Sequence, residues 1–395
     1  MKKVLFMALA LVSAMMFTAC DPDTKTPDGD KTKLWPAGVD GENLYGYINK
    51  SGEMVIKANF KDANYFSCGW ALVLDEDGEY AYIDKDGKKA RGAEADYYRP
   101  FYYDRARFGE KGSNGTLYGM WDTDFQAIIP ADYKSLGNNS NDGLIYFSED
   151  AKKYGYLDEK GKVVIPDDFD YAYSFDDGIA VVVEVNSSDE ARYGVIDTKG
   201  NELIEMQKKS LYNLGEARVS FYNDSKNKYG IWDKKGEEIV SATYDNIDPF
   251  TCGLALVEKN DKWGYIDTKG NEVIDLQYAG AMQFYDDVAW VQKNADSKVE
   301  LIDKKGNSLF KLKDTEQPYG YFHNGLCEIY NSDSHKYYYI NKDNEKVYTW
   351  DPTASDKDDM PARKSLRELS NEWIKATEYG PLFIDMEQCK AQIAR

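Results

Sequence analysis

Side chains that could perform acid–base or nucleophilic chemistry are scarce in this sequence. Its only histidines are His323 and His335, whereas zinc sites and Ser-His-Asp or Cys-His arrangements usually depend on imidazole. His335 lies in a polar run that predicts a solvated turn, and His323 lies among aromatic residues and is expected to pack. No phosphate-binding loop, dinucleotide fingerprint or nucleophile elbow occurs. We therefore expect no catalytic residue, no cofactor and no metal ion.

Acidic side chains are numerous but scattered. The chain has 69 acidic and 49 basic residues and a formal net charge of −20 at pH 7, and such a surface repels nucleic acid. The acidic run at residues 75–79 is too short for a calcium loop and is typical of a tight turn. A glycosidase needs two carboxylates in one cleft, and no pair is distinguished here. A carbohydrate-active enzyme is the least favoured function.

The N-terminus has the pattern of an export signal. Two lysines precede an apolar run over residues 4–17, which is too short to span a bilayer comfortably, and Thr18-Ala19-Cys20 follows. The segment resembles the lipobox of bacterial lipoproteins, with Phe17 where leucine is usual. The resemblance implies a signal peptide over residues 1–19 and lipidation of Cys20, which gives stable anchoring through three acyl chains. Plain secretion is the alternative.

Residues 20–33 lack large apolar side chains and are expected to form a flexible tether. Acidic residues close behind an acylated cysteine resemble the surface-export signal of some Gram-negative lipoproteins. In other bacteria an aspartate directly after the cysteine retains the protein at the inner membrane. We expect the outer membrane or cell surface, with the lipid anchor as the only membrane contact.

One short phrase recurs nine times between residues 34 and 350. It reads aromatic, Gly, aromatic or aliphatic, aliphatic, Asp or Asn, two polar residues and Gly. Its second residue is Gly46, Ala81, Gly119, Gly155, Gly194, Gly230, Gly264, Glu300 or Tyr338, at spacings of 34–39 residues. After the phrase, an apolar residue precedes an aromatic by four positions: Ile56 and Phe60, Ile129 and Tyr133, Ile165 and Phe169, Val240 and Tyr244, Ile274 and Tyr278. A phenylalanine, a turn and a second apolar run complete the unit, which indicates a tandem-repeat fold.

The phrase predicts a β-hairpin. Asp-x-x-Gly between apolar runs suits a type I turn closed by a left-handed glycine, with the Asp carboxylate capping turn amides. Phe125 and Asn344 replace this glycine; because phenylalanine tolerates that backbone poorly, we expect the third hairpin to turn differently. Each unit of about 36 residues is then a three-stranded antiparallel meander that must stack on its neighbours. The connecting aromatics are expected to fill the seams, and the phrase glycine leaves room for a neighbouring ring or backbone.

These features resemble the WG, or KWG, repeat family of bacterial envelope proteins, over roughly residues 34–350 and most closely at Trp263-Gly264-Tyr265-Ile266-Asp267. The resemblance implies an all-β repeat fold and an envelope or surface location, but no defined reaction. Nine units exceed the roughly 4–8 blades of most propellers, and three strands fall short of four, although a short strand in the connection could supply the fourth. We expect an open β-solenoid or superhelical array, with a closed propeller-like ring as the alternative.

Residues 351–395 differ in character. A polar segment leads to Pro361 and an amphipathic pattern, which predicts a short helical cap over the last repeat rather than a docking helix. Four cysteines follow Cys20. Cys68 and Cys252 share a repeat position five repeats apart, so these two are not expected to pair, and with Cys327 and Cys389 they are interpreted as small buried side chains.

Binding is the remaining interpretation. Repeat arrays present extended surfaces, and Tyr and Trp suit both protein hot spots and stacking on sugars. The candidates, at least half of them expected in the core, are Trp35, Trp70, Trp121, Trp232, Trp290 and Trp350. We expect a non-catalytic envelope lipoprotein that binds an envelope or extracellular protein, with a polysaccharide as the alternative ligand. A row of exposed aromatics would favour the glycan, and a mixed aromatic–arginine patch would favour a protein.

Overall fold

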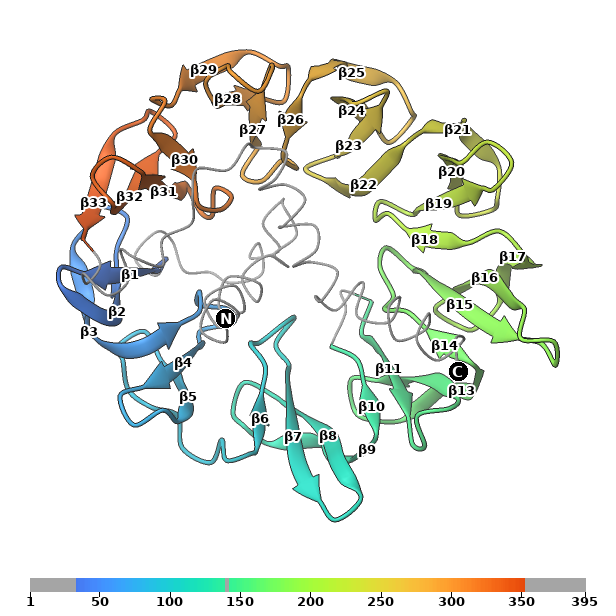
Figure 1. Ribbon diagram of the computed structural model, residues 1–395. Coiled ribbons are helices and arrows are strands. Elements are labelled where there is room, and N and C mark those ends of the chain that lie inside the picture. The colour runs from blue at the N-terminus through green and yellow to red at the C-terminus, as the bar shows by residue number, and fades with distance from the viewer. Residues whose placement is uncertain (1–32, 139–141, 352–395) are drawn as a thin grey trace. The chain divides into compact units, whose positions relative to one another are not determined.

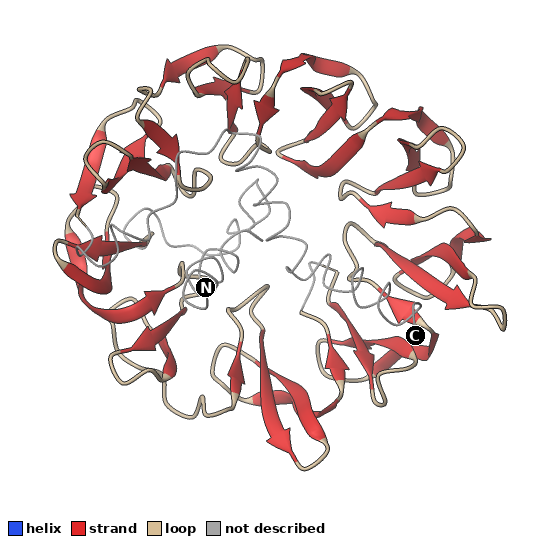
Figure 2. Ribbon diagram, viewed as in Figure 1, coloured by secondary structure: helices blue, strands red, loops and turns tan. Residues whose placement is uncertain are grey.

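The computed structural model describes residues 33–138 and 142–351. These residues form strands, turns and loops without a helix (Figure 2), so none of them belongs to a helix long and apolar enough to cross a membrane. The predicted signal peptide, Cys20, the tether up to residue 32 and the cap beyond Asp351 lie outside the described residues.

The strands form eight antiparallel sheets, and each sheet takes its strands in chain order (Figure 1). The first has five strands: β1 (Trp35–Val39), β2 (Glu42–Ile48), β3 (Met54–Ala63), β4 (Ala71–Asp75) and β5 (Tyr80–Ile83). Three four-stranded sheets follow: β6 (Tyr97–Tyr98), β7 (Ala106–Gly112), β8 (Gly115–Trp121) and β9 (Ala127–Tyr133); β10 (Ser135–Leu136), β11 (Leu144–Ser148), β12 (Tyr154–Asp158) and β13 (Val163–Phe169); β14 (Tyr171–Ala172), β15 (Ile179–Val185), β16 (Ala191–Asp197) and β17 (Glu202–Gln207). Four more complete the order: β18 (Leu211–Asn213), β19 (Arg218–Asn223), β20 (Lys228–Asp233) and β21 (Glu238–Tyr244); β22 (Asn246–Thr251), β23 (Leu254–Lys259), β24 (Lys262–Asp267) and β25 (Glu272–Tyr278); β26 (Gly280–Ala281), β27 (Val288–Gln292), β28 (Glu300–Asp303) and β29 (Ser308–Lys311); β30 (Glu316–Pro318), β31 (Leu326–Asn331), β32 (Lys336–Asn341) and β33 (Lys346–Trp350).

The seven four-stranded sheets share one frame. The apolar run forms the second strand, the recurring phrase forms the third, and the fourth follows the Asp-x-x-Gly turn. The first strand lies in the connection from the preceding sheet and has two or three residues in six of these sheets and six residues in β22; for example, Ala172 pairs with Val182. The prediction of three strands per unit was therefore wrong, because buried backbone groups in the connection need hydrogen-bond partners and find them on the second strand.

Nine copies of the phrase occupy eight sheets. Strand β3 (Met54–Ala63) runs from its pairing with the first copy into its pairing with β4, with a register shift between Phe60 and Asp62. It therefore serves as the last strand of one unit and the first strand of the next. The second copy, on β5, shares this five-stranded sheet, so the expectation of nine separate units is corrected to eight sheets.

The phrase glycine fits a bulge in the fourth strand. Opposite Gly155, the register jumps from Tyr154–Phe169 to Tyr156–Ile165. A Cβ on Gly155 would lie 2.5 Å from the carbonyl oxygen of Ile165. The same jump produces the four-residue spacing between apolar and aromatic residues seen in the sequence. The prediction that the glycine leaves room for a neighbouring backbone is confirmed.

The bulge and the phrase glycine occur together in the copies of the phrase. All six copies that carry glycine show this register shift. Where Glu300 or Tyr338 replaces it, the third and fourth strands pair without a shift at that point. The bulge therefore accompanies the glycine in these eight copies.

The Asp-x-x-Gly turns form as predicted, including the turn without glycine. Asp158 accepts the backbone N–H groups of Lys160 and Lys162, each at 2.9 Å. Phe125 adopts the left-handed conformation (φ 57°) and its N–H donates to the Asp122 carbonyl, so the prediction of a different third turn was wrong. The left-handed backbone costs about 1–2 kcal/mol, and burial of a phenylalanine ring stabilises by about 1.5–3 kcal/mol.

That burial is visible around the Phe125 ring. The ring packs edge-on against Phe101 at 5.6 Å and against Trp121 at 6.0 Å between centroids. Only 8% of Phe125 is exposed. Packing therefore offsets the backbone strain at this position.

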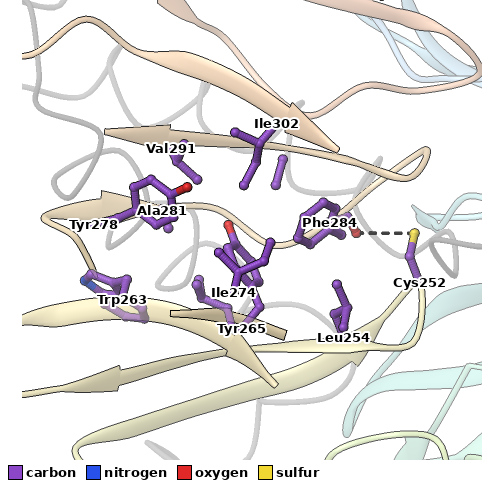
Figure 3. Close-up of a cluster of buried hydrophobic side chains, with 12 residues drawn as sticks. Cys252, Leu254, Trp263, Tyr265, Ile274, Tyr278, Ala281, Phe284, Val291 and Ile302 are labelled. Carbon is purple, nitrogen blue, oxygen red and sulfur yellow. Dashed lines mark hydrogen bonds between the residues drawn. The ribbon is translucent and has the colours of Figure 1, made fainter. Parts of the chain in front are cut away.

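Aromatic residues fill the seams between sheets. In the cluster of Figure 3, Tyr265 on β24 packs against Phe284 of the following connection, with ring centroids 4.7 Å apart, and donates its hydroxyl to the Met282 carbonyl. The same pair of contacts joins Tyr156 to Phe175 and Tyr173, and Tyr47 to Phe66 and Asn64. The prediction that connecting aromatics occupy the seams is confirmed.

The described residues fall into two compact units. One comprises the chain up to Ala90 with Phe250–Asp267 and the chain from Asn271 onward, and the other comprises Arg91–Pro249 with Thr268–Gly270. Each unit is considered below by itself.

Within the first unit, the first and last sheets are in direct contact. Tyr339 donates its hydroxyl to the Pro36 carbonyl at 2.8 Å; in its own strand it holds the phrase position that Tyr265 holds in β24. In the other direction, the Trp35 indole donates to the His323 carbonyl at 2.7 Å. The two ends of the repeat array thus meet through contacts of the kind found between consecutive sheets.

This contact contradicts the predicted open array, whose end sheets would not touch. Open ends would expose aromatic faces to water, which is unfavourable for large apolar side chains. Here the two end sheets bury one another in a shared cluster: Trp35, Ala37, Ile48, Leu326, Tyr330, Tyr337, Tyr339 and Trp350. Contact between the ends is what the alternative, a propeller-like closure, requires.

Candidate binding site

The tryptophans named as candidates are mostly core residues. Five of the six are at most 9% exposed: Trp35, Trp121, Trp232, Trp290 and Trp350. Trp70 alone among them is partly exposed. A row of tryptophan rings able to stack on a sugar chain is therefore absent from the described residues.

Both histidines are engaged locally. The His323 ring lies against Tyr65, with centroids 4.4 Å apart, and its Nε2 is 2.9 Å from the Asn324 amide nitrogen. His335 is exposed in a turn, and its Nδ1 is 3.0 Å from the Tyr330 hydroxyl.

No disulfide joins the three cysteines within the described residues. Cys252 and Cys327 are buried and Cys68 is partly buried. Cys68 and Cys252 both begin a two-residue turn between strands, with φ near 50° (52° and 51°), which confirms their shared repeat position. Cys389 lies outside the described residues.

Carboxylates gather at the corresponding turns of the second unit. Asp142 accepts the backbone N–H of Gly178, and Asp177 accepts that of Glu216. Burial raises the pKa of Asp176 to about 7, and the neighbouring acids Asp177, Asp142 and Glu216 add to the effect. Over residues 33–138 and 142–351, no three His, Cys, Asp or Glu side chains are arranged to hold a metal ion. These carboxylates instead join consecutive sheets.

Comparison of equivalent positions in the sheets identifies two charged residues where most sheets have an uncharged one. The position compared lies on the strand before the phrase, opposite the third residue of the phrase, and its side chain faces the seam. It is usually buried and uncharged, as in Leu72, Val181, Ser220, Leu256 and Trp290. At this position β7 carries Arg107, opposite Met120, and β31 carries Glu328, opposite Tyr339. Charges at a core position are costly unless they are compensated.

Arg107 reaches across the seam into the next sheet. One Nη donates to the Leu136 carbonyl on β10, and the guanidinium lies over the Tyr118 ring at 5.4 Å from its centroid. Its Nε is buried and has no hydrogen-bond acceptor. Arg105, two residues earlier on the same face, also has a buried Nε without an acceptor.

Further arginine and tyrosine side chains surround Arg107. Burial lowers the pKa of Arg107; Tyr146, Tyr118 and Tyr102 oppose the change, and Arg99 adds to it. Burial likewise raises the pKa of Tyr102 to about 12, against the opposing influence of Arg99 and Arg107. We call Arg99, Arg107, Tyr102, Tyr118 and Tyr146 the Arg107 cluster.

Solvent reaches the Arg107 cluster. Arg99 is exposed, and the other four members are partly exposed. Among the described residues, no carboxylate lies within ion-pair distance of Arg105 or Arg107. The cluster is therefore an open, positively charged and aromatic site on an acidic protein.

This seam lacks the tyrosine–phenylalanine pair of its counterparts. Met120 stands where Tyr47, Tyr156 and Tyr265 donate their hydroxyls across other seams. Arg107 supplies a hydrogen bond across the seam instead. A tyrosine would make such a bond without burying a charge, so the need for a seam contact does not explain an arginine here.

Sequence reasoning missed the Arg107 cluster although a signal existed. The apolar runs Trp70–Val73 and Ile179–Val182 align with Arg105–Phe108 once the phrase residues are matched. Two arginines then fall on core positions. The degenerate third copy concealed this alignment.

Comparisons with known proteins agree with the repeat analysis. The sequence profile of the family described as "WG containing repeat" matches residues 45–80, 154–186, 229–263 and 263–295. No curated protein matches the chain.

Among solved structures, the dihydro-heme d1 dehydrogenase NirN in complex with DHE is similar at 12% identity, over 82% of this chain and 74% of that chain, with a TM-score of 0.41. Kluyveromyces lactis Hsv2 is similar at 11% identity, over 70% of this chain and 95% of that chain, with a TM-score of 0.33. Likeness at this level carries no information about activity.

Repeated four-stranded sheets whose first and last members touch define a repeat-containing, β-propeller-like protein. Four of its repeats match the profile of WG-containing repeats, the family that the sequence resembles.

Proposed function

We propose that this protein is a non-catalytic lipoprotein of the cell envelope that binds a protein partner through the Arg107 cluster. The observation that carries the proposal is the mixed arginine–tyrosine composition of this open site. Arginine and tyrosine are enriched among the residues that dominate protein–protein binding energy. The burial of five candidate tryptophans weighs against the glycan alternative.

The envelope location rests on the lipobox-like Thr18-Ala19-Cys20 segment. A lipid anchor followed by a flexible tether would hold the repeat domain close to the membrane, where other envelope proteins are abundant. The non-catalytic role is supported by the local engagement of both histidines.

In-cell crosslinking of the anchored protein followed by mass spectrometry tests this function. We expect one envelope protein to be captured reproducibly by the wild type, and capture to fall when Arg99→Ala and Arg107→Leu are combined. Arg192→Ala, at an exposed arginine on β16, is the control and should leave capture unchanged.

Two results would count against the proposal. One is an empty crosslinking experiment although the protein is abundant at the surface. The other is capture that persists in the double variant. If an array of polysaccharides then bound the protein, the glycan alternative would replace it.

A further inference from the structure

The Arg107 guanidinium uses only part of its hydrogen-bonding capacity. An arginine has five N–H donors in a planar fork. One Nη donates to the Leu136 carbonyl, whereas the buried Nε has no acceptor. The buried Nε of Arg105 is likewise without one. Burial keeps water from both Nε atoms, so an acceptor from outside reaches Arg107 at its Nη groups, of which only one donates to a group within the described residues.

Leaving these donors unsatisfied costs stability, so a structural role explains them poorly. A buried polar group without a partner is normally worth a penalty in folding. Other sheets avoid that penalty with Leu72, Val181 or Leu256 at this position. Positions that break an otherwise consistent pattern are expected to be functional sites.

The missing acceptor is best matched by a carboxylate. The two Nη groups of arginine can pair end-on with the two oxygens of a carboxylate in a bidentate arrangement. A net charge of −20 repels long polyanions such as nucleic acid. The rings of Tyr102, Tyr118 and Tyr146 favour apolar neighbours beside the anionic group.

We propose that the Arg107 cluster binds a single carboxylate of its partner, an acidic side chain or a chain terminus flanked by apolar residues. This inference rests on the proposed protein-binding function and adds the chemistry of recognition. Arg107 forms the bidentate pair, Arg99 supplies a second positive charge, and Tyr118 holds the guanidinium plane from beneath.

Benzoate is a suitable probe, because it presents one carboxylate on an apolar ring, and benzamide is its neutral control. Both are titrated into the ¹⁵N-labelled repeat-containing chain at constant ionic strength, and the arginine Nε–H signals are followed by NMR. We expect the Arg107 signal, assigned from its absence in Arg107→Leu, to shift saturably with benzoate and not with benzamide.

Three variants separate binding from folding. Arg107→Leu restores the residue type of Leu72 and Leu256, so it should fold with a melting temperature no lower than that of the wild type, while benzoate affinity falls on the order of 10- to 100-fold. Arg99→Ala, which removes an exposed charge, should weaken binding by about 2- to 5-fold. Arg192→Ala should bind benzoate like the wild type.

Equal shifts with benzoate and benzamide would overturn the inference, as would full benzoate affinity in Arg107→Leu. A marked loss of melting temperature in Arg107→Leu, with unchanged binding in Arg99→Ala, would show Arg107 to be a seam contact. Failure here is distinguishable from failure of the proposed function. Absent benzoate binding with persistent protein capture removes only the carboxylate, whereas benzoate binding without capture removes the protein partner.

Discussion

Replacing Gly155 with alanine would place a methyl group inside the bulge of β13. Its Cβ would lie 2.5 Å from the Ile165 carbonyl oxygen and 2.7 Å from the Asp167 backbone nitrogen. Both are main-chain atoms, so a side-chain rotation cannot relieve the contact. Overpacking of this kind costs about 1–3 kcal/mol, and the lower entropy of the unfolded alanine chain returns about 0.4–1 kcal/mol. We expect a net loss of about 1–2 kcal/mol.

The free energy of unfolding can be measured by urea titration followed by circular dichroism. Gly112→Ala is the matched control, since the nearest atom to its Cβ would be 3.4 Å away on Gly115 and only the entropy gain of about 0.4–1 kcal/mol should remain. If Gly155→Ala were as stable as Gly112→Ala, the glycine would not be what specifies the bulge. The link between glycine and register would then have to be abandoned.

Three further substitutions test other parts of the structure. Phe125→Gly should relieve the strain of the left-handed backbone but lose the burial of the ring, with a net destabilisation of about 2–3 kcal/mol. The control Asn344→Gly, at an exposed turn, should change the free energy of unfolding by no more than about 0.5 kcal/mol. A stabilised Phe125→Gly protein would contradict the packing explanation. Tyr265→Phe should cost about 1–3 kcal/mol, because a buried carbonyl loses its donor. The control Tyr80→Phe, at a residue 47% exposed, should change stability little. Equal effects would show that the hydroxyl at the seam does not contribute to stability. Burial raises the pKa of Glu328 to about 8 from an ordinary value of 4.5, so the folded protein binds the proton more tightly, and stability should fall as pH rises from about 4.5 to about 8. In Glu328→Gln this component should vanish from thermal unfolding measured across that range, and an unchanged pH profile would refute it.

The hairpins and seams could be predicted because their signals are local. The pairing of Ile165 with Tyr156 and of Phe169 with Tyr154 was implied by a four-residue spacing, and the turn aspartates by Asp-x-x-Gly. The Phe125 turn was not predictable, since a backbone preference of one residue was outweighed by rings from elsewhere in its sheet.

Contact between the ends of the array was also beyond sequence reasoning. A repeat of about 36 residues specifies one unit and its contact with the next. Whether the last unit returns to the first depends on the small rotation between units, summed over the whole array. Contacts such as the bond from Tyr339 to Pro36 reveal the outcome, and those residues are separated by most of the chain.

Departures from the repeat differ in whether the fold itself accounts for them. Glu300 and Tyr338 replace a glycine, and the bulge that required glycine is missing in both sheets. Phe125 replaces a turn glycine, and ring packing offsets the strain. Arg107 replaces a core residue, yet the seam leaves its Nε without an acceptor. The first three are resolved within the fold and the last is not, and for this reason we place the proposed binding site at Arg107.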